Sequence, residues 1–285
     1  MMHVTDEGLA AVALTAPDDR AYRFAATAAA RLKSGVRFLL PQIAFFIVMA
    51  LAWDGMARWL ATPLVPGVAP IYREFLHIAD KGFVFQEIGT TFSRMSLGFL
   101  LALAIALPIG ITTAYSKTAA RFVEPGLILG LTVPGLVWAL LCVIWFGVSL
   151  VSPVISVALG VLPSLVITVQ QGIRSLSLEI IQMATVFRFT RRTVIRRIWL
   201  PLLYSFMIGG CRVGFSIAWK VIVLAEIFGM SSGVGYQLHA QFSTQNVEGV
   251  IAWTLAFWVA MLVIEHGIFA PLERHSTHWK KATDR

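Results

Sequence analysis

Long apolar stretches recur along the chain and are separated by shorter polar segments. Six windows are long and mostly apolar, at residues 38–56, 96–115, 127–148, 151–170, 202–228 and 250–270. A helix of roughly 20 apolar residues crosses the hydrocarbon core of a bilayer. Because only a few residues around Gly147 separate the third window from the fourth, these two windows predict a helical hairpin. The pattern therefore predicts an all-α integral membrane protein with about six transmembrane helices.

The composition also indicates a protein that has lipid as its solvent. Of the 285 residues, 58% are hydrophobic and 13% are charged, and the mean hydropathy is +0.77. Soluble domains carry roughly 25% charged residues, so this chain has too little polar surface to stay in water. The net charge of +8 lies mostly between the apolar windows, as in cytoplasmic loops of membrane proteins, and nucleic acid is not an expected partner. Cys142 and Cys211 lie far apart in apolar windows and predict neither a disulfide framework nor a metal site.

The distribution of basic residues predicts the orientation of the chain. Residues 1–37 are polar and basic and lack the early apolar stretch of a cleaved signal peptide, so we expect a poorly ordered arm followed by a retained helix. With this arm in the cytoplasm, 17 of the 23 Lys and Arg residues lie inside, four lie outside, and two lie within the fifth window. This excess follows the positive-inside rule. Both termini are therefore expected in the cytoplasm.

The segment 171–201 is the longest connection on the predicted cytoplasmic side. Its apolar residues from Leu178 to Phe187 recur at near-helical spacing, which predicts a short amphipathic helix. A second, basic helix is expected after Arg188–Phe189–Thr190, leading into Leu200–Pro201. The apolar face of the first helix needs a cover. Either the lipid headgroup region or a groove on a partner protein can supply it.

Short motifs are placed at fixed spacings along most of the chain. In the cytoplasmic loop, Gln182–Met183–Ala184 is followed by Arg188 and then, twelve residues later, by Leu200–Pro201. The others are Ser93–Arg94, Gly98–Phe99, Pro108–Ile109–Gly110, Pro134, Trp138, Trp145–Phe146–Gly147, Gly210, Arg212, Ala218–Trp219, Ala225–Glu226 and Gly233–Val234–Gly235–Tyr236. Together these motifs resemble the binding-protein-dependent ABC permeases, the inner-membrane components of ATP-driven importers. The resemblance covers residues 38–275 and is similar in particular to the nitrate/sulfonate/taurine/bicarbonate branch.

Two loop positions depart from the family pattern, which reads Glu-Ala-Ala, three residues, and Gly. Gln182 replaces the acidic residue and Arg188 replaces the glycine. Glycine adopts a positive φ readily, whereas Arg does so at a cost of about 1 kcal/mol. We therefore expect the loop to bend differently, or to dock on a partner with an acidic groove. The resemblance implies that an ATPase contacts Gln182, Met183, Ala184, Thr185, Val186, Phe187, Arg188, Phe189 and Thr190.

The source of energy is expected to lie in a separate subunit. No Gly-x-x-x-x-Gly-Lys-Ser/Thr loop, which cradles nucleotide phosphates, occurs in the sequence. The resemblance implies a permease without enzymatic activity or a cofactor of its own, whose partner ATP-binding cassette ATPase subunits hold ATP and Mg²⁺. It also implies a second permease copy and an extracytoplasmic solute-binding protein that docks near residues 63–85 and 229–247.

The same resemblance implies a location and a domain organisation. We expect a multi-pass protein of the bacterial inner membrane. Its parts would be a cytoplasmic N-terminal arm (1–37), a transmembrane permease domain (38–272) with a coupling loop (171–201), and a cytoplasmic tail (273–285).

Charged residues inside membrane spans are costly and by default indicate function. Arg212 and Lys220 lie eight residues apart in the fifth window, about 80° around a helix, with Ser216 between them. We expect this face, with Glu226 as a further candidate, to border the path of a small anionic or polar solute such as a sulfonate, nitrate or taurine. The alternative is structural. Arg212 would cap carbonyls or reach the interface, Lys220 would pair with a carboxylate on another helix, and Glu226 would make an architectural hydrogen bond.

Three other functional classes remain as alternatives. A secondary transporter would need ion-coupling carboxylates in mid-span, and the windows hold almost none. An intramembrane enzyme would need convergent catalytic groups, which the sequence lacks. A degenerate permease that pairs with an ordinary one is suggested by Gln182 and Arg188.

Overall fold

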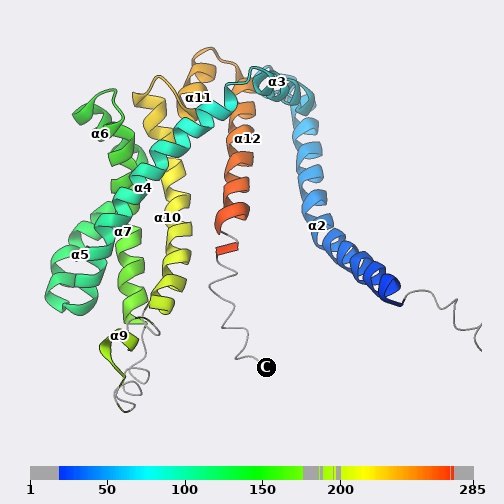
Figure 1. Cartoon of the computed structure of the whole chain (residues 1–285). Coiled ribbons are helices and arrows are strands. Elements are labelled where there is room, and N and C mark those ends of the chain that lie inside the picture. Colours follow the sequence, from blue (N-terminus) through cyan, green and yellow to red (C-terminus); the bar gives the residue numbers. More distant parts are fainter. Residues whose placement is uncertain are drawn as a thin grey trace, which may run out of the picture. The chain divides into compact units, whose positions relative to one another are not determined.

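The computed structural model of the protein describes residues 19–175, 186, 189–194, 196, 200–269 and 271–272. Within those residues the chain is built from helices and contains no strand (Figure 1). The predicted all-α class is therefore confirmed for this part of the chain. The chain divides after Val68 into two units, which are described separately.

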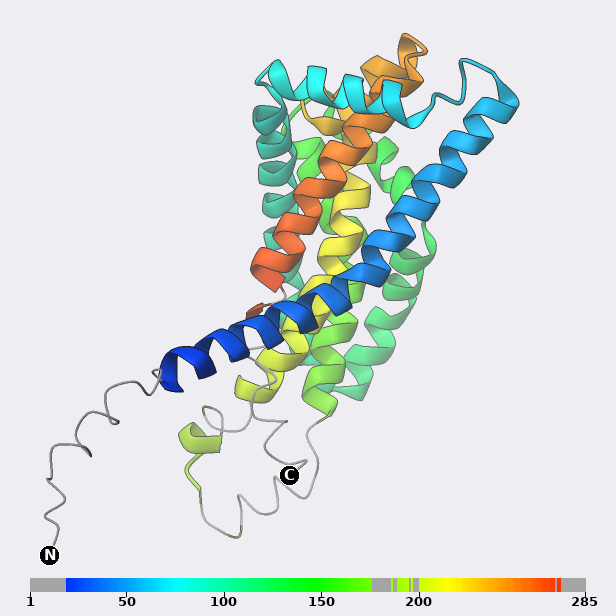
Figure 2. The same cartoon turned by 90° about the vertical axis from the view of Figure 1, so that its right-hand side faces the viewer.

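The first unit contains one long helix, α2 (Asp19–Leu60). It begins well inside the arm that we expected to be poorly ordered up to residue 37. Its part Leu40–Leu60 is long and apolar enough to cross a membrane. The helix is bent along its length (Figures 1 and 2) and contains Pro41, which lacks the N–H that closes a helical turn. After the helix, the chain folds back, and the Trp53 indole donates a hydrogen bond to the Pro66 carbonyl (2.9 Å).

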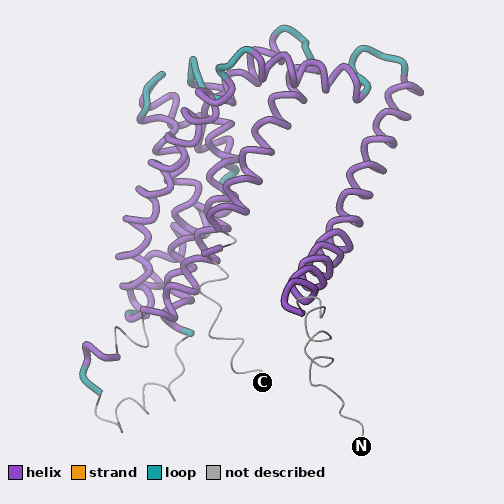
Figure 3. Tube along the Cα trace, turned by 45° about the vertical axis from the view of Figure 1, so that its right-hand side comes forward, coloured by secondary structure: helices purple, strands orange, loops and turns teal. Residues whose placement is uncertain are grey.

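The second unit is a helical bundle around three long helices, α4 (Val84–Tyr115), α7 (Val151–Arg174) and α10 (Leu200–Gly229). Of these, α7 packs along both α4 and α10 (Figure 1). Figure 3 shows the described segments as helices joined by loops. A further long helix, α12 (Val247–Ile264), continues into a short π-helical segment, Glu265–Phe269. The remaining elements are α3 (Val68–Asp80), α5 (Lys117–Thr132), α6 (Gly135–Phe146), α9 (Arg191–Val194) and α11 (Val234–Ser243).

Among the described residues, five helical segments are long and apolar enough to cross a membrane, and the pair α5 and α6 makes six if it is counted as one span. This agrees with the predicted number of about six. The five segments are Leu40–Leu60, Val84–Tyr115, Val151–Arg174, Phe206–Gly229 and Val247–Gly267.

The third predicted window, 127–148, is apolar throughout, but the helix is not continuous across it. The axes of α5 and α6 differ by 98°. Pro134 has no N–H to continue the hydrogen bonding of α5, and a proline disfavours helical backbone at the residue before it. Accordingly Val133 is extended, with φ −67° and ψ 122°. Beyond α6, Gly147 at φ +66° turns the chain into α7, so the predicted hairpin lies between α6 and α7.

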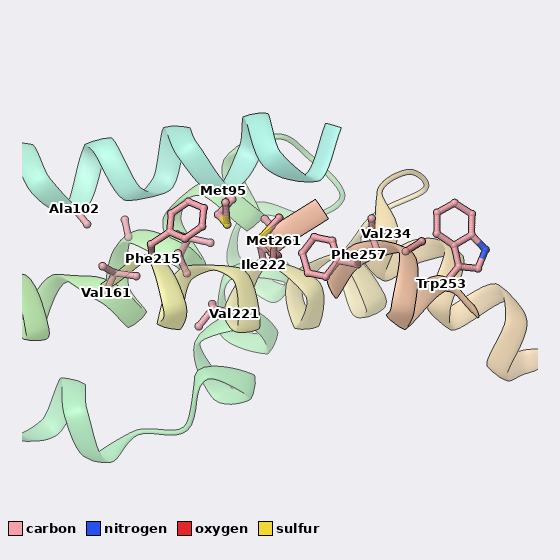
Figure 4. Close-up of a cluster of buried hydrophobic side chains, with 14 of the residues drawn as sticks. Met95, Ala102, Val161, Phe215, Val221, Ile222, Val234, Trp253, Phe257 and Met261 are labelled. Carbon is pink, nitrogen blue, oxygen red and sulfur yellow. The ribbon is translucent and has the colours of Figure 1, made fainter. Parts of the chain in front are cut away.

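Apolar side chains from α4, α7, α10, α11 and α12 meet in one core (Figure 4). Met95, Val161 and Ile222 are fully buried or nearly so, and Trp253 of α12 is 1% exposed. The Trp253 ring lies against Phe83 with its centroid 5.8 Å away. This core fixes the position of α10, which carries the predicted site.

Small residues let the helices approach one another closely, as is common in membrane bundles. A Cβ atom on Gly98 would lie 2.6 Å from the Val154 carbonyl oxygen and 2.7 Å from the Val157 Cβ atom. The α4–α7 contact therefore depends on the absence of a side chain at this position.

We expect Gly98→Ala to lower the stability of the purified protein by about 1–3 kcal/mol, because an extra methyl group in a packed contact forces the backbones apart. Gly126→Ala in α5 is the matched control, since a Cβ atom there has no neighbour within 4 Å. The control should be neutral or stabilising, because alanine favours helix over glycine. Equal thermal unfolding temperatures of the two variants in detergent would contradict this account of the α4–α7 contact.

Candidate functional site

Several of the exposed residues of α10 lie along one side of the helix. Gly209, Arg212, Ser216 and Lys220 are all exposed and follow one another at intervals of three or four residues. Such spacing places side chains one above the other on a helix. The structure therefore brings together three of the four residues that the sequence suggested for a solute path. We call the face formed by Arg212, Ser216 and Lys220 the α10 face.

Arg212 does not stand alone on this face. Its guanidinium forms an ion pair with the carboxylate of Glu265, at the start of the π-helical segment after α12. The side chains are 47% and 26% exposed. From the sequence, Glu265 needs no special role, because it lies near the end of the last apolar window, where solvation is available, and 53 residues from Arg212. A depth argument could have found it, since at 1.5 Å per residue both lie roughly 26 Å from the adjoining ends of two antiparallel helices.

Lys220 has a different environment. Its ammonium group lies 5.7 Å from the centroid of the neighbouring Trp219 ring, a weak cation–π contact at an exposed site. In the described part of the chain, none of the ion pairs includes Lys220. The carboxylate partner that the structural alternative required for Lys220 is thus absent from the described residues.

A cavity of about 320 Å³ opens between α10 and α12 beside the α10 face. Its walls are mainly aromatic and aliphatic, and Ser216 and Glu265 are among the few polar side chains on them. The lining residues are Phe215, Ser216, Trp219, Thr254, Leu255, Phe257, Trp258, Met261, Leu262 and Glu265.

Glu226 lies elsewhere, inside the bundle, and has no solvent exposure. Its carboxylate pairs with Arg94 of α4 (2.8 Å) and accepts hydrogen bonds from the Thr91 hydroxyl (2.8 Å) and the Gly235 N–H (3.0 Å). Glu226, the further candidate for the path, therefore does not lie on the α10 face. A carboxylate whose oxygens are all occupied by fixed donors serves architecture, which was the alternative considered for it.

The helix α11 begins without a capping side chain of its own, because its N-cap residue is Gly233. Three successive N–H groups are instead capped by other helices. Gly233 donates to Glu87, Val234 donates to the Thr91 hydroxyl (2.8 Å), and Gly235 donates to Glu226. Two carboxylates at a helix N-terminus also interact favourably with its dipole. We call Glu87, Thr91, Arg94 and Glu226 the polar clamp.

Glycine is required at position 233 for two reasons. Its φ is +101°, and a Cβ atom would lie 2.2 Å from a Glu226 carboxylate oxygen. Arg94 completes the clamp by donating to the carbonyl and the hydroxyl of Ser232 (2.8 and 2.7 Å). Sequence reasoning found Arg94, Glu226 and Gly233 only through motifs and missed Glu87 and Thr91, which look like ordinary polar residues at the start of a helix.

The predicted coupling loop lies largely outside the described residues. This holds for Gln182, Met183, Ala184, Thr185, Phe187 and Arg188. Of the others, Val186 and Phe189 are exposed (78% and 46%). The Thr190 hydroxyl accepts from the Thr193 N–H (3.3 Å), which caps α9 at the place where the sequence predicted a basic helix. Within the described part of the chain, no three His, Cys, Asp or Glu side chains are grouped as metal ligands.

We expect Arg94→Met to destabilise the protein by about 3–5 kcal/mol, because it leaves the buried Glu226 carboxylate without its counter-charge. The double variant Arg94→Met/Glu226→Gln removes both charges and should recover part of that loss. Thermal unfolding of the purified variants in detergent measures both effects. Strict additivity of the two single changes would show that the pair is not coupled.

Comparisons with known proteins agree with this architecture. Residues 106–266 match the family model described as the binding-protein-dependent transport system inner membrane component. The putative aliphatic sulfonates transport permease protein SsuC of Bacillus subtilis (strain 168) is 30% identical over 244 residues, which cover 86% of this chain and 87% of that protein. The taurine transport system permease protein TauC of Escherichia coli (strain K12) is 24% identical over 82% of this chain and 86% of its own length.

A solved structure shows the same fold. The MetNI methionine ABC transporter, in an inward facing conformation, contains a chain that matches with a TM-score of 0.60 and 12% identity, over 70% of this chain and 98% of that chain. This likeness and the family match both agree with the helical bundle and the apolar spans described above. The chain belongs to the family of binding-protein-dependent transport system inner membrane components, and it is thus an inner-membrane ABC importer permease.

Proposed function

We propose that the α10 face borders the translocation path through which an ATP-driven importer moves a small anionic or polar solute. The observation that carries this proposal is the presence of two cations, Arg212 and Lys220, on the exposed side of a membrane-spanning helix. Relatives named for aliphatic sulfonates and for taurine make a sulfonate-like solute the best candidate.

The α10 face is unsuited to contact with lipid. Placing an Arg or Lys side chain at the bilayer centre costs about 2.5–3.5 kcal/mol on insertion scales, and such residues nearly always face protein or a water-filled cavity. A second copy of the chain, related by two-fold symmetry, covers the face and leaves water between the copies. The path then lies between two α10 helices.

The proposed importer also needs partner subunits. ATP hydrolysis takes place in separate ATPase subunits, which contact the coupling loop around residues 182–190. A solute-binding protein docks on the opposite side, on segments 63–85 and 229–247, the second of which contains α11. The arm (1–37), the coupling loop (171–201) and the tail (273–285) lie in the cytoplasm, in line with their basic residues.

Purification of the tagged protein from its native membranes should recover a soluble ATPase that carries a phosphate-binding loop. Met183→Asp together with Phe187→Asp should reduce the recovered ATPase about tenfold or more, because the apolar side of the coupling loop loses its contacts. Lys117→Asp is the control, since Lys117 is an exposed residue outside the loop on the same predicted side.

Two outcomes would count against this reading. If the unchanged protein brings no ATPase with it, the chain is an independent transporter or a degenerate partner subunit, as Gln182 and Arg188 allow. If Lys117→Asp removes the ATPase as fully as the loop variant does, the coupling loop is not the specific contact.

The aqueous nature of the α10 face can be tested with a single thiol. In a background with Cys142→Ala and Cys211→Ala, Ser216→Cys should react with membrane-impermeant thiol reagents, because thiolates form only where water reaches them. Leu100→Cys on α4, where the leucine is 58% exposed and expected to face lipid, should react at least about tenfold more slowly. Equal rates at the two positions would remove the α10 face as a path.

A further inference from the structure

The two cations of the α10 face are not equivalent. We infer that Lys220 is the fixed charge that meets the anionic group of the solute during its passage, and that Arg212 is a structural residue whose charge Glu265 neutralises. This inference rests on the proposed function of the α10 face and assigns its specificity to one side chain.

The structural role of Arg212 follows from its pairing. Its guanidinium contacts the Glu265 carboxylate, so the pair joins α10 to the end of α12 and contributes no net charge to the face. Glu265 also lines the cavity that Ser216 lines, which means that the carboxylate borders the same space. Arg212 itself does not line this space, so the pair offers an anion there no net positive charge.

Lys220 contributes the net charge. It lies nine residues before the end of α10, roughly 14 Å along the helix and thus deep in the apolar span Phe206–Gly229. It is exposed, and within the described ranges it contacts the Trp219 ring but no carboxylate. The Lys220 ammonium group is therefore presented at mid-span without a carboxylate partner among the described residues.

Ser216 offers a probe position between the two cations. Arg212 precedes it by four residues and Lys220 follows it by four, so both are one helical turn away. Helical side chains lean toward the N-terminus of their helix. The Lys220 side chain therefore leans toward position 216, whereas that of Arg212 leans away from it.

The experiment measures the local potential with the Ser216→Cys protein in the background without Cys142 and Cys211. The thiol is treated with an anionic reagent, 2-sulfonatoethyl methanethiosulfonate, and with a cationic one, 2-(trimethylammonium)ethyl methanethiosulfonate. The ratio of the anionic to the cationic rate reports the sign and size of the nearby charge. Neither the transported solute nor the ATPase is needed.

Lys220→Met should lower this ratio about tenfold, because a unit charge one turn away is lost. Lys220→Arg should keep the ratio within about twofold. Arg212→Met alone should also lower it, because Glu265 then stands uncompensated, and adding Glu265→Gln should restore it to within about twofold of the parent protein.

The inference is overturned if Lys220→Met leaves the ratio unchanged, or if Arg212→Met/Glu265→Gln lowers it as much as Lys220→Met does. Absence of reaction with either reagent would instead overturn the proposed path itself. In cells, uptake of a radiolabelled alkanesulfonate should fall at least about tenfold with Lys220→Met and recover with Lys220→Arg while the ATPase still co-purifies with both. Unchanged uptake with Lys220→Met, with the ATPase bound, would refute the role of Lys220 and leave the importer assignment intact.

Discussion

The carboxylate of Glu226 lies where α4, α10 and the start of α11 meet, and its hydrogen bonds join all three. A buried charge without partners costs several kcal/mol, so Glu226 is tolerated only while Arg94, Thr91 and the Gly235 N–H surround it. Thr91 and Glu226 also hold α11 against the bundle, because they accept hydrogen bonds from its first N–H groups, which no side chain of α11 caps. The direction of α10, and with it the orientation of the exposed side of that helix, follows from this arrangement.

One helix thus uses its polar residues in three ways. Glu226 is buried and fully bonded, Arg212 is paired at the surface of the bundle, and Lys220 is exposed. Their sequence positions alone suggest a single group of charged residues in one apolar window. The difference comes from the partners, which other helices supply. In a bilayer the presence or absence of a partner matters more than in water, because lipid forms no hydrogen bonds with an unpaired polar group.

The sequence was sufficient to predict what depends on local pattern. The long apolar segments and the hairpin at the short break around Gly147 follow from hydropathy, and a basic helix is expected after Thr190, where α9 begins. It was not sufficient where distant segments meet. The bend at Pro134 divides a window that is uniformly apolar, and α2 begins before its apolar part. The Arg212–Glu265 pair and the contacts of Glu87 and Thr91 with α11 join residues that are far apart in the chain, and no periodic pattern encodes such pairings.

The capping of α11 by side chains of α4 and α10 has a consequence for biosynthesis. Arg94 is made 132 residues before Glu226, an interval on the order of ten seconds at ordinary translation rates. During that time neither Glu226, whose carboxylate balances the charge of Arg94, nor α11 has been synthesised. Until the fifth span emerges, the charge of Arg94 must therefore be solvated by water or by other protein groups. The ion pair, and with it the capping of α11, can therefore form only late in synthesis, after the fifth span has been made.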